Sequence, residues 1–445
     1  MPKEPRVKVG ILSAPTITFT LTGLYILPSG EMVSGRQEVS ISESGLAVSW
    51  NGKTYPSLEF EPTSYLGDSF ELEGVTIGVD FHWERKENQR FRGALRLIVE
   101  NGKVTAINEV NVEDYLVSVI SSEMSSTSSL ELLRAHAVIS RGWVLSMISR
   151  GATPITPAES RPDVRALNPG PSLIKYWDRE DHLNFDVCAD DHCQRYQGTT
   201  RQTTEAVDLA VNETAGMVLT DKDGELCDAR FSKCCGGVFE EFENCWEPIH
   251  YHYLKATRDS EKPSAFPDLK VEENAKAWIE GAPEAFCNTR DKEILGQVLN
   301  NYDQETTDFY RWTVEYTQDE LGSLIKERSG IDYGKILALE PIHRGTSGRL
   351  VRLRIIGTKR TMTIGKELEI RRTLSTSHLY SSAFVVEVPS RDADGVPESF
   401  RLRGAGWGHG VGLCQIGAAV MGARGYNFRQ ILEHYYADSS LTKLY

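Results

Sequence analysis

The chain has 445 residues, of which 40% are hydrophobic and 25% charged, the composition of an ordinary globular protein with room for two or three domains. Its 63 acidic residues outnumber the 49 basic ones, giving a formal net charge of −14. Proteins that mainly neutralise phosphates concentrate Lys and Arg on one face, so we expect no nucleic-acid partner. No apolar run reaches the length of a membrane span, so we also expect none in this chain.

Residues 1–105 are predicted to form a β-rich lobe. Short apolar runs, such as Val7–Ile11, Ile17–Leu21 and Leu95–Val99, are separated by Gly, Asn and Ser without a helical period. The uncharged stretch 10–30 has the composition of a signal peptide, but Thr alternates with apolar residues within it. We therefore interpret that stretch as a half-buried strand, and no signal peptide is visible.

Residues 106–445 are predicted to form a mixed α/β region. Asn111 to Asp114 can cap a first helix, and Ser128 to Glu131 has the capping-box pattern of a second helix that runs to about Ser149. Between the two helices we expect a short loop, Ser121–Ser125. The predicted fold class is therefore α+β, with the β-rich N-terminal lobe packed on a mixed α/β catalytic region.

The rest of this region divides into a long loop, an accessory segment and a glycine-rich end. Residues 151–198 are rich in Pro, Asp, His and Cys, and form a loop too long to stay ordered without an anchor. Residues 254–345 are predicted to be an accessory segment of amphipathic helices. The other predicted elements are a short helix at 204–212, strands near 216–219, 227–232, 350–357 and 383–388, and helices at 413–424 and from Asn427 onward.

The long loop contains four metal-ligating side chains within twelve residues: His182, Cys188, His192 and Cys193. Two imidazoles and two thiolates are the ligand set of a tetrahedral zinc site, and these soft donors exclude Ca²⁺ and Mg²⁺. Because all four positions would be protein ligands, the predicted zinc is structural and anchors the loop. The alternative is a disulfide between the two cysteines, with two surface histidines.

A glycine ladder runs from Gly404 to Gly412 with Trp407 and His409 in alternate positions. In an extended conformation every glycine would lie on one face of the strand. The two ring-bearing side chains suit a sugar-stacking surface beside a polar group. The alternative is a core strand with a satisfied histidine, and a phosphate-binding loop is disfavoured because the lysine of a P-loop is missing.

Glu123 lies in the Ser-rich loop between the two predicted helices. A lone acidic residue in such a place is usually a surface carboxylate or a cap. If the loop faces a cleft, partial burial and the C-terminal end of the preceding helix would favour the protonated form that a general acid needs, whereas the N-terminus of the following helix would oppose it. Cys234-Cys235 before Gly236-Gly237 could form a nucleophile turn with His409, but vicinal cysteines beside a turn are more often structural.

Together these residues resemble the family of stage II sporulation protein D and the LytB-type amidase enhancers. The resemblance lies in Val112–Leu116 and Ser122–Met124, in the helix carrying Arg134, His136 and Arg141, in Phe231–Gly237 with Trp246, and in the C-terminal block Gly406–Ala418 followed by His434–Tyr436. It runs in order from about residue 105 to 445. Cys234, Cys235 and Cys414 replace the usual small hydroxyl residues, and His136 replaces a Gln.

The resemblance implies a peptidoglycan lytic transglycosylase. Such an enzyme cleaves the bond between N-acetylmuramic acid and N-acetylglucosamine, and the glutamate of the Ser-Glu-Met motif, here Glu123, is the acid/base. Candidate glycan-binding residues, on motif membership, are Arg134, Arg141, Trp407, His409 and Gln415. The resemblance also implies peptidoglycan strands and a cell-wall amidase as partners, and a place in the cell envelope. The alternatives are a non-catalytic peptidoglycan-binding enhancer of an amidase and a zinc hydrolase.

Overall fold

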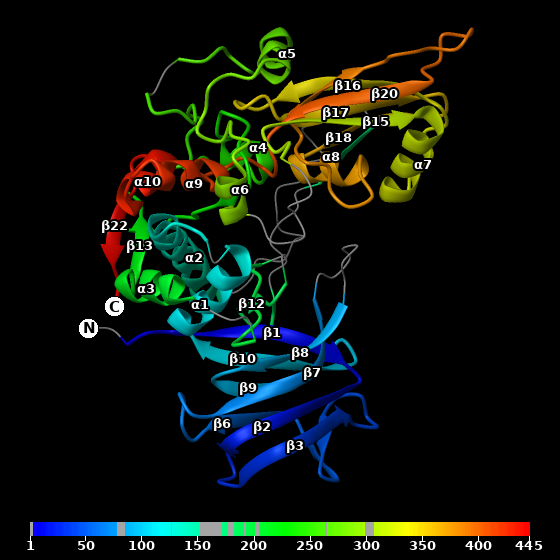
Figure 1. The fold of residues 1–445 in the computed structure, drawn as a ribbon. Helices are drawn as coiled ribbons and strands as arrows, with labels where there is room; N and C mark the ends of the chain where they lie inside the picture. The colour runs from blue at the N-terminus through cyan, green and yellow to red at the C-terminus, as the bar shows by residue number, and fades with distance from the viewer. Residues whose placement is uncertain are drawn as a thin grey trace.

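The structure is a computed structural model of the 445-residue chain, and it is a mixed α+β protein (Figure 1). The described residues are 3–77, 85–125, 127–151, 171–175, 182–190, 193–200, 204–262, 265–298 and 307–445. A β-rich lobe lies at one end, a group of helices in the middle and smaller sheets at the other end (Figure 1). The two chain termini lie close together beside the middle helices (Figure 1).

The N-terminal lobe is built from the first ten strands, as the alternating sequence pattern predicts. Their bounds are β1 (Arg6–Ala14), β2 (Thr16–Ile26), β3 (Met32–Ile41), β4 (Val48–Trp50), β5 (Lys53–Tyr55), β6 (Ser57–Pro62), β7 (Ser69–Ile77), β8 (Arg85–Phe91), β9 (Ala94–Glu100) and β10 (Lys103–Asn111). The strand order is β12-β1-β10-β9-β6-β2-β3-β4-β5, with β7 between β2 and β8. Aromatic side chains fill the lobe, where Phe19 meets Phe60 edge to face and Phe70 stacks on Phe91.

The first three helices of the chain lie in the middle of the molecule: α1 (Val112–Glu123), α2 (Leu130–Gly151) and α3 (Glu205–Glu213). Helix α1 follows β10 directly and buries Tyr115, Leu116, Val119 and Ile120, residues at helical spacing. The predicted loop between the first two helices is shorter than expected, since Ser121, Ser122 and Glu123 form the last turn of α1.

The C-terminal half contains two further sheets and several short helices. The four-stranded sheet is β11 (Ser172–Ile174), β18 (Thr361–Gly365), β17 (Leu350–Gly357) and β16 (Ile336–Arg344), and the three-stranded sheet is β15 (Arg311–Thr317), β20 (Ser399–Ala405) and β19 (Phe384–Glu387). The helices are α4 (Phe242–Cys245), α5 (Glu272–Glu280), α6 (Lys292–Val298), α7 (Gln318–Ser329), α8 (Glu367–Thr373), α9 (Gln415–Ala423) and α10 (Phe428–Tyr435).

The accessory segment 254–345 is less helical than predicted. It contains α5, α6 and α7, but also β15 and β16, which pair with strands from later in the chain. Helical periodicity identifies α7 but gives no sign of β15, whose partner lies far along the chain, or of β16, which pairs with the next strand. Among the described residues, no helix is long and apolar enough to cross a membrane.

Two short strand pairs join distant parts of the middle region. They are β13 (Met217–Thr220) with β22 (Ser440–Lys443), and β14 (Phe231–Ser232) with β21 (Leu413–Cys414). The glycine ladder between β20 and β21 is not an extended strand, because four of its alternate glycines have φ between 71° and 92°. A buried arginine requires this path: a Cβ on Gly410 would lie 2.4 Å from the guanidinium carbon of Arg349.

Candidate functional site

Glu123 is the last residue of α1, and its side chain is half-buried. The helix ends there, with the backbone N–H of Met124 still donating to the carbonyl of Ile120. The carboxyl group therefore lies at the C-terminal end of the helix, where the macrodipole favours the neutral, protonated form of an acid.

The loop that follows Glu123 is held by α6. The backbone N–H of Ser125 donates to the carbonyl of Gln297 at 3.0 Å, and the Ser128 hydroxyl donates to the same carbonyl at 2.6 Å. The side-chain oxygen of Gln297 accepts from the backbone N–H of Ser129 at 3.1 Å. These three bonds fix the connection between α1 and α2.

The His/Cys loop is attached to the N-terminal sheet by a short strand, β12 (Val187–Cys188), which pairs in parallel with β1. Three of the four predicted ligands come together there: the ligand atoms of His182, Cys188 and Cys193 all lie within 4.8 Å of one another. Both cysteines are free thiols, so the alternative disulfide is not formed. The fourth predicted ligand, His192, lies outside the described residues.

The chain that leaves this cluster packs against α1. The Tyr115 hydroxyl donates to the side-chain oxygen of Gln194 at 3.2 Å, and the backbone N–H of Gln197 donates to the Ser118 hydroxyl at 3.0 Å. Burial raises the pKa of Tyr115 well above its ordinary value, and nearby Cys193, Cys188 and Glu123 are among the groups that raise it further. The His/Cys cluster and Glu123 thus flank one buried phenol.

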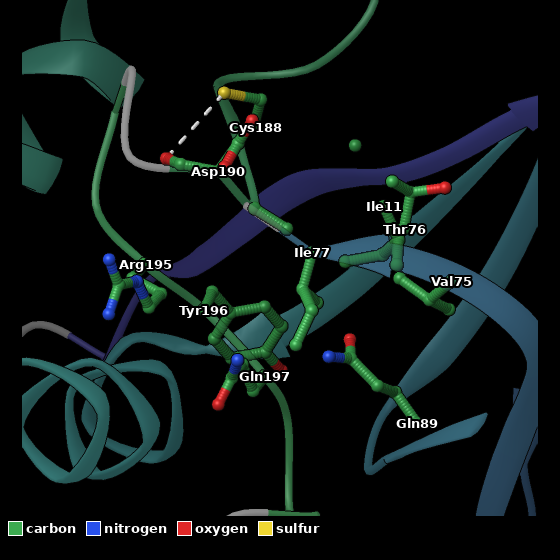
Figure 2. A pocket seen from close by; sticks show the side chains of 12 residues that line it. Ile11, Val75, Thr76, Ile77, Gln89, Cys188, Asp190, Arg195, Tyr196 and Gln197 are labelled. Atoms are coloured by element: carbon green, nitrogen blue, oxygen red, sulfur yellow. Dashed lines mark hydrogen bonds between the residues drawn. The ribbon is translucent and has the colours of Figure 1, made fainter. Parts of the chain in front are cut away.

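A small cavity lies between the His/Cys loop and the N-terminal lobe (Figure 2). Cys188 and Asp190 line it from the loop, and Ile77 and Gln89 from the strands, with Tyr196 and Gln197 closing another side (Figure 2). Its volume of about 100 Å³ is well below the roughly 300–1,000 Å³ of pockets that enclose drug-sized ligands. It cannot enclose a disaccharide.

Two of the five candidate glycan-binding residues are fully buried. Arg141 is 0% exposed and donates to both carboxylate oxygens of Glu113 and to the Met217 carbonyl. Gln415 is 2% exposed, and its amide nitrogen lies 3.1 Å from Nε2 of His136. Both side chains hold core elements together, so the contacts do not support the expectation that they bind a glycan directly.

The other three candidates are partly exposed. Arg134 links α2 to α3 through ion pairs with Glu131 and Glu213. The Trp407 ring packs against Tyr380 and Phe309, with centroids 4.4 and 4.7 Å away.

His409 lies in the glycine ladder Gly404–Gly412, which forms a loop and is called the glycine loop below. Its ring packs against the Trp246 ring, with centroids 4.8 Å apart. Its Nδ1 accepts the backbone N–H of Val411 at 3.0 Å. Burial lowers the pKa of His409 well below its ordinary value, and the nearby Arg230 and Arg349 lower it further. The imidazole is therefore neutral at pH 7, and a hydrogen bond to the backbone of Phe231 holds it as well.

A second group of potential metal ligands was not predicted as a site from the sequence. Cys235, Asp259, Cys287 and Cys414 are all buried, and their ligand atoms also lie within 4.8 Å of one another. The sequence signal is that six of the eight cysteines lie between residues 188 and 245, but Cys287 and Cys414 lie outside that range.

Helices α1 and α2, with Glu123 at the end of α1, lie within a part of the chain that matches a known protein family. Residues 100–220 match the family model described as stage II sporulation protein, and residues 240–412 match a domain of unknown function, DUF8618. This match and the similarity to the relatives below support membership of the stage II sporulation protein D family.

Curated relatives agree with this assignment. Stage II sporulation protein D of Bacillus subtilis is 22% identical over 343 residues, covering 76% of each chain. The protein of the same name from Bacillus amyloliquefaciens is 23% identical and covers 76% of this chain and 78% of its own. An uncharacterized protein of Brachyspira hyodysenteriae is 24% identical over 392 residues, covering 88% of this chain and 78% of its own.

Proposed function

We propose that the protein is a peptidoglycan lytic transglycosylase with Glu123 as its acid/base. Membership of the stage II sporulation protein D family, which is associated with peptidoglycan degradation, supports the substrate class. The observation that carries the mechanism is the position of Glu123, a half-buried carboxyl at the end of α1 next to a loop clamped by Gln297. A peptidoglycan substrate places the protein in the cell envelope.

One carboxyl group is sufficient for this reaction. Protonated Glu123 gives its proton to the glycosidic oxygen as the bond to C1 of N-acetylmuramic acid breaks. The resulting carboxylate then takes the proton from the 6-hydroxyl of the same sugar, whose oxygen attacks C1 and closes a 1,6-anhydro ring. No water is consumed, whereas a glycoside hydrolase uses two carboxylates flanking the bond.

The half-buried residues of the glycine loop are the better candidates for contact with the glycan. Trp407 offers part of an aromatic ring and His409 a neutral imidazole, and both are only partly covered by protein. Arg134 joins them at a partly exposed position on α2. We assign Arg141 and Gln415 instead to the packing behind the site.

We also propose that His182, Cys188 and Cys193, with His192, bind a structural zinc ion. Soft thiolate and imidazole ligands favour Zn²⁺, and a full set of protein ligands leaves no open position for chemistry. Metal binding of this type contributes about 10 kcal/mol to ordering a segment without a core of its own. Here it would order the loop that packs against α1 through Gln194 and Gln197.

The test is incubation of the full chain with purified sacculi, with and without stem peptides, followed by mass spectrometry of the released fragments. We expect anhydro-muropeptides from the wild-type protein and none from Glu123→Gln. The glutamine keeps the side-chain shape but can neither donate a proton as an acid nor accept one as a base. The exposed Glu205→Gln variant is the matched control and should be fully active.

Three results would contradict the mechanism. Anhydro products from Glu123→Gln would exclude Glu123 as the acid/base. A wild-type protein that binds sacculi without releasing products, but accelerates an added cell-wall amidase, would instead be a non-catalytic enhancer. Activity that is lost with a chelator but survives Glu123→Gln would indicate a zinc hydrolase.

A further inference from the structure

Four metal-ligating side chains from distant parts of the chain meet in the core behind the glycine loop. Cys235 follows β14, Asp259 and Cys287 come from the accessory segment, and Cys414 ends β21. None of the four is more than 2% exposed, and the three cysteines are free thiols. This buried cluster is separate from the His/Cys loop and plays no part in the proposed chemistry of Glu123.

The spacing of the ligand atoms matches a single tetrahedral ion. Sγ of Cys235 lies 3.5 Å from Sγ of Cys287 and 3.5 Å from Oδ2 of Asp259. Since a Zn–S bond is about 2.3 Å long, two tetrahedral sulfur ligands lie roughly 3.8 Å apart. All four ligand atoms lie within 4.8 Å of one another, which leaves room for one ion between them.

The surroundings of the cluster orient its donor atoms. The Tyr435 hydroxyl donates to Oδ1 of Asp259 at 3.1 Å, and Nε2 of His434 lies 3.3 Å from the same oxygen. This leaves Oδ2 on the side of the sulfurs. Outer contacts of this type are what hold a ligating carboxylate in place in metal sites.

Backbone N–H groups point at two of the sulfur atoms. Cys235 N–H donates to Sγ of Cys414 at 3.2 Å, and Gly237 N–H donates to Sγ of Cys235 at 3.4 Å. Cys414 is also the N-cap residue of the nine-residue helix α9, whose N-terminal end favours a negative charge. Both features stabilise thiolates, the form in which cysteine binds metal.

A buried cation next to the cluster needs negative charge nearby. Arg349 is 1% exposed, and its guanidinium donates to the carbonyls of Gly408, Cys235 and Cys234 and to the Ser347 hydroxyl. The Ser347 hydroxyl donates in turn to Oε2 of the buried Glu240 at 2.6 Å, so one carboxylate already lies one hydrogen bond away from this cation. Three thiolates and one carboxylate around Zn²⁺ carry a net charge of −2, which would add to this compensation.

We propose that Cys235, Asp259, Cys287 and Cys414 form a second, structural zinc site. Binding displaces the three thiol protons to solvent and leaves four protein ligands, so no position is open for substrate. The ion would join Asp259, before α5, and Cys287, between α5 and α6, to the turn after β14 and to the start of α9. Helix α6 carries Gln297, so the site also secures the clamp on the loop after Glu123; the proposal itself does not depend on Glu123 being catalytic.

Metal content of the full chain, purified under reducing conditions and incubated with Zn²⁺, tests this proposal. We expect two zinc ions per wild-type chain by elemental analysis and one in the variant Cys188→Ser/Cys193→Ser. With Co²⁺ as the probe, that variant should bind one equivalent and show thiolate-to-cobalt charge-transfer absorption. Adding Cys287→Ser should abolish the absorption, whereas adding Cys227→Ser, a buried cysteine outside both clusters, should leave it unchanged.

A folded Cys188→Ser/Cys193→Ser protein that binds no Co²⁺ would overturn the proposal. So would a disulfide among the cluster cysteines, seen as a loss of two hydrogens by mass spectrometry under the same reducing conditions. If Cys287→Ser does not fold, Tyr435→Phe removes only the hydrogen bond to Asp259. That variant should bind Co²⁺ about 10–100-fold more weakly, and an unchanged affinity would count against the site.

Discussion

Replacing Glu113 by Gln should be one of the most destabilising single changes in the molecule outside the proposed sites. Glu113, in the first turn of α1, accepts two hydrogen bonds from Arg141 at 2.8 and 2.6 Å. It also accepts from the backbone N–H of Gly216 at 3.1 Å and from the Tyr445 hydroxyl at 2.7 Å. One carboxylate thus joins α1, α2, the start of β13 and the C-terminus.

The cost follows from the burial of Arg141, whose side chain is 0% exposed while that of Glu113 is 17% exposed. Removing one partner of a buried ion pair costs about 3–5 kcal/mol, because the other charge remains buried without compensation. In Glu113→Gln the amide NH₂ also replaces an acceptor and faces the guanidinium N–H groups. We expect a loss of about 3–5 kcal/mol in unfolding free energy, measured by urea denaturation followed by circular dichroism.

A double variant separates this reasoning from a simple loss of packing. Glu113→Gln/Arg141→Met removes the buried cation as well, so it should recover much of the lost stability. As a control, Glu73→Gln breaks an exposed ion pair with Arg36 and should leave the urea midpoint unchanged. Losses that simply add in the double variant, or a single variant within about 1 kcal/mol of wild type, would refute the argument.

Two other changes test the core behind the glycine loop. Burial lowers the pKa of His136 from 6.5 to about 3, so the stability contributed by the neutral ring is complete above pH 6.5 and is lost as the pH falls from there toward 3. This group should therefore make the wild-type protein about 2 kcal/mol less stable at pH 5 than at pH 7, and His136→Gln should remove that difference. The measurement is the unfolding free energy from urea denaturation at the two pH values. An unchanged pH dependence in the variant would contradict a buried, neutral His136. Gly410→Ala should destabilise the protein by more than the roughly 1–2 kcal/mol of an unfavourable φ, because its Cβ would lie 2.4 Å from the guanidinium carbon of Arg349. Gly395→Ala has a similar φ with open space around the Cβ, and equal thermal shifts in the two variants would contradict the steric argument.

Local sequence signals predicted the elements that depend on neighbouring residues. Asn427 and Gln430 form the capping box expected at the start of α10, and Thr204 caps α3. His182, Cys188 and Cys193 meet because they are close in sequence and the intervening chain is fixed by β12 on β1. In each case the interaction spans only a few residues, so its pattern is visible in the sequence.

Features that depend on distant partners could not be predicted in the same way. The sequence left the conformation of the glycine ladder open, and its glycines adopt left-handed φ values beside Arg349, a residue about 60 positions earlier in the sequence. Arg141 was expected at a glycan surface, and only the structure shows that Glu113 holds it in the core. The buried cluster needs Cys235 and Cys414 together, a contact that no local period encodes.

The two family regions of this chain depend on each other at the proposed active site. Glu123 lies within residues 100–220, whereas Cys287 and Gln297 lie within the segment matched by the domain of unknown function at 240–412. The hydrogen bonds from Ser125, Ser128 and Ser129 to Gln297 cross between these regions. A rigid acid/base requires its supporting contacts to be rigid too. The second region therefore helps to hold the loop after Glu123 in place. A metal ion bound in the buried cluster would affect catalysis through α6, without contacting the glycan.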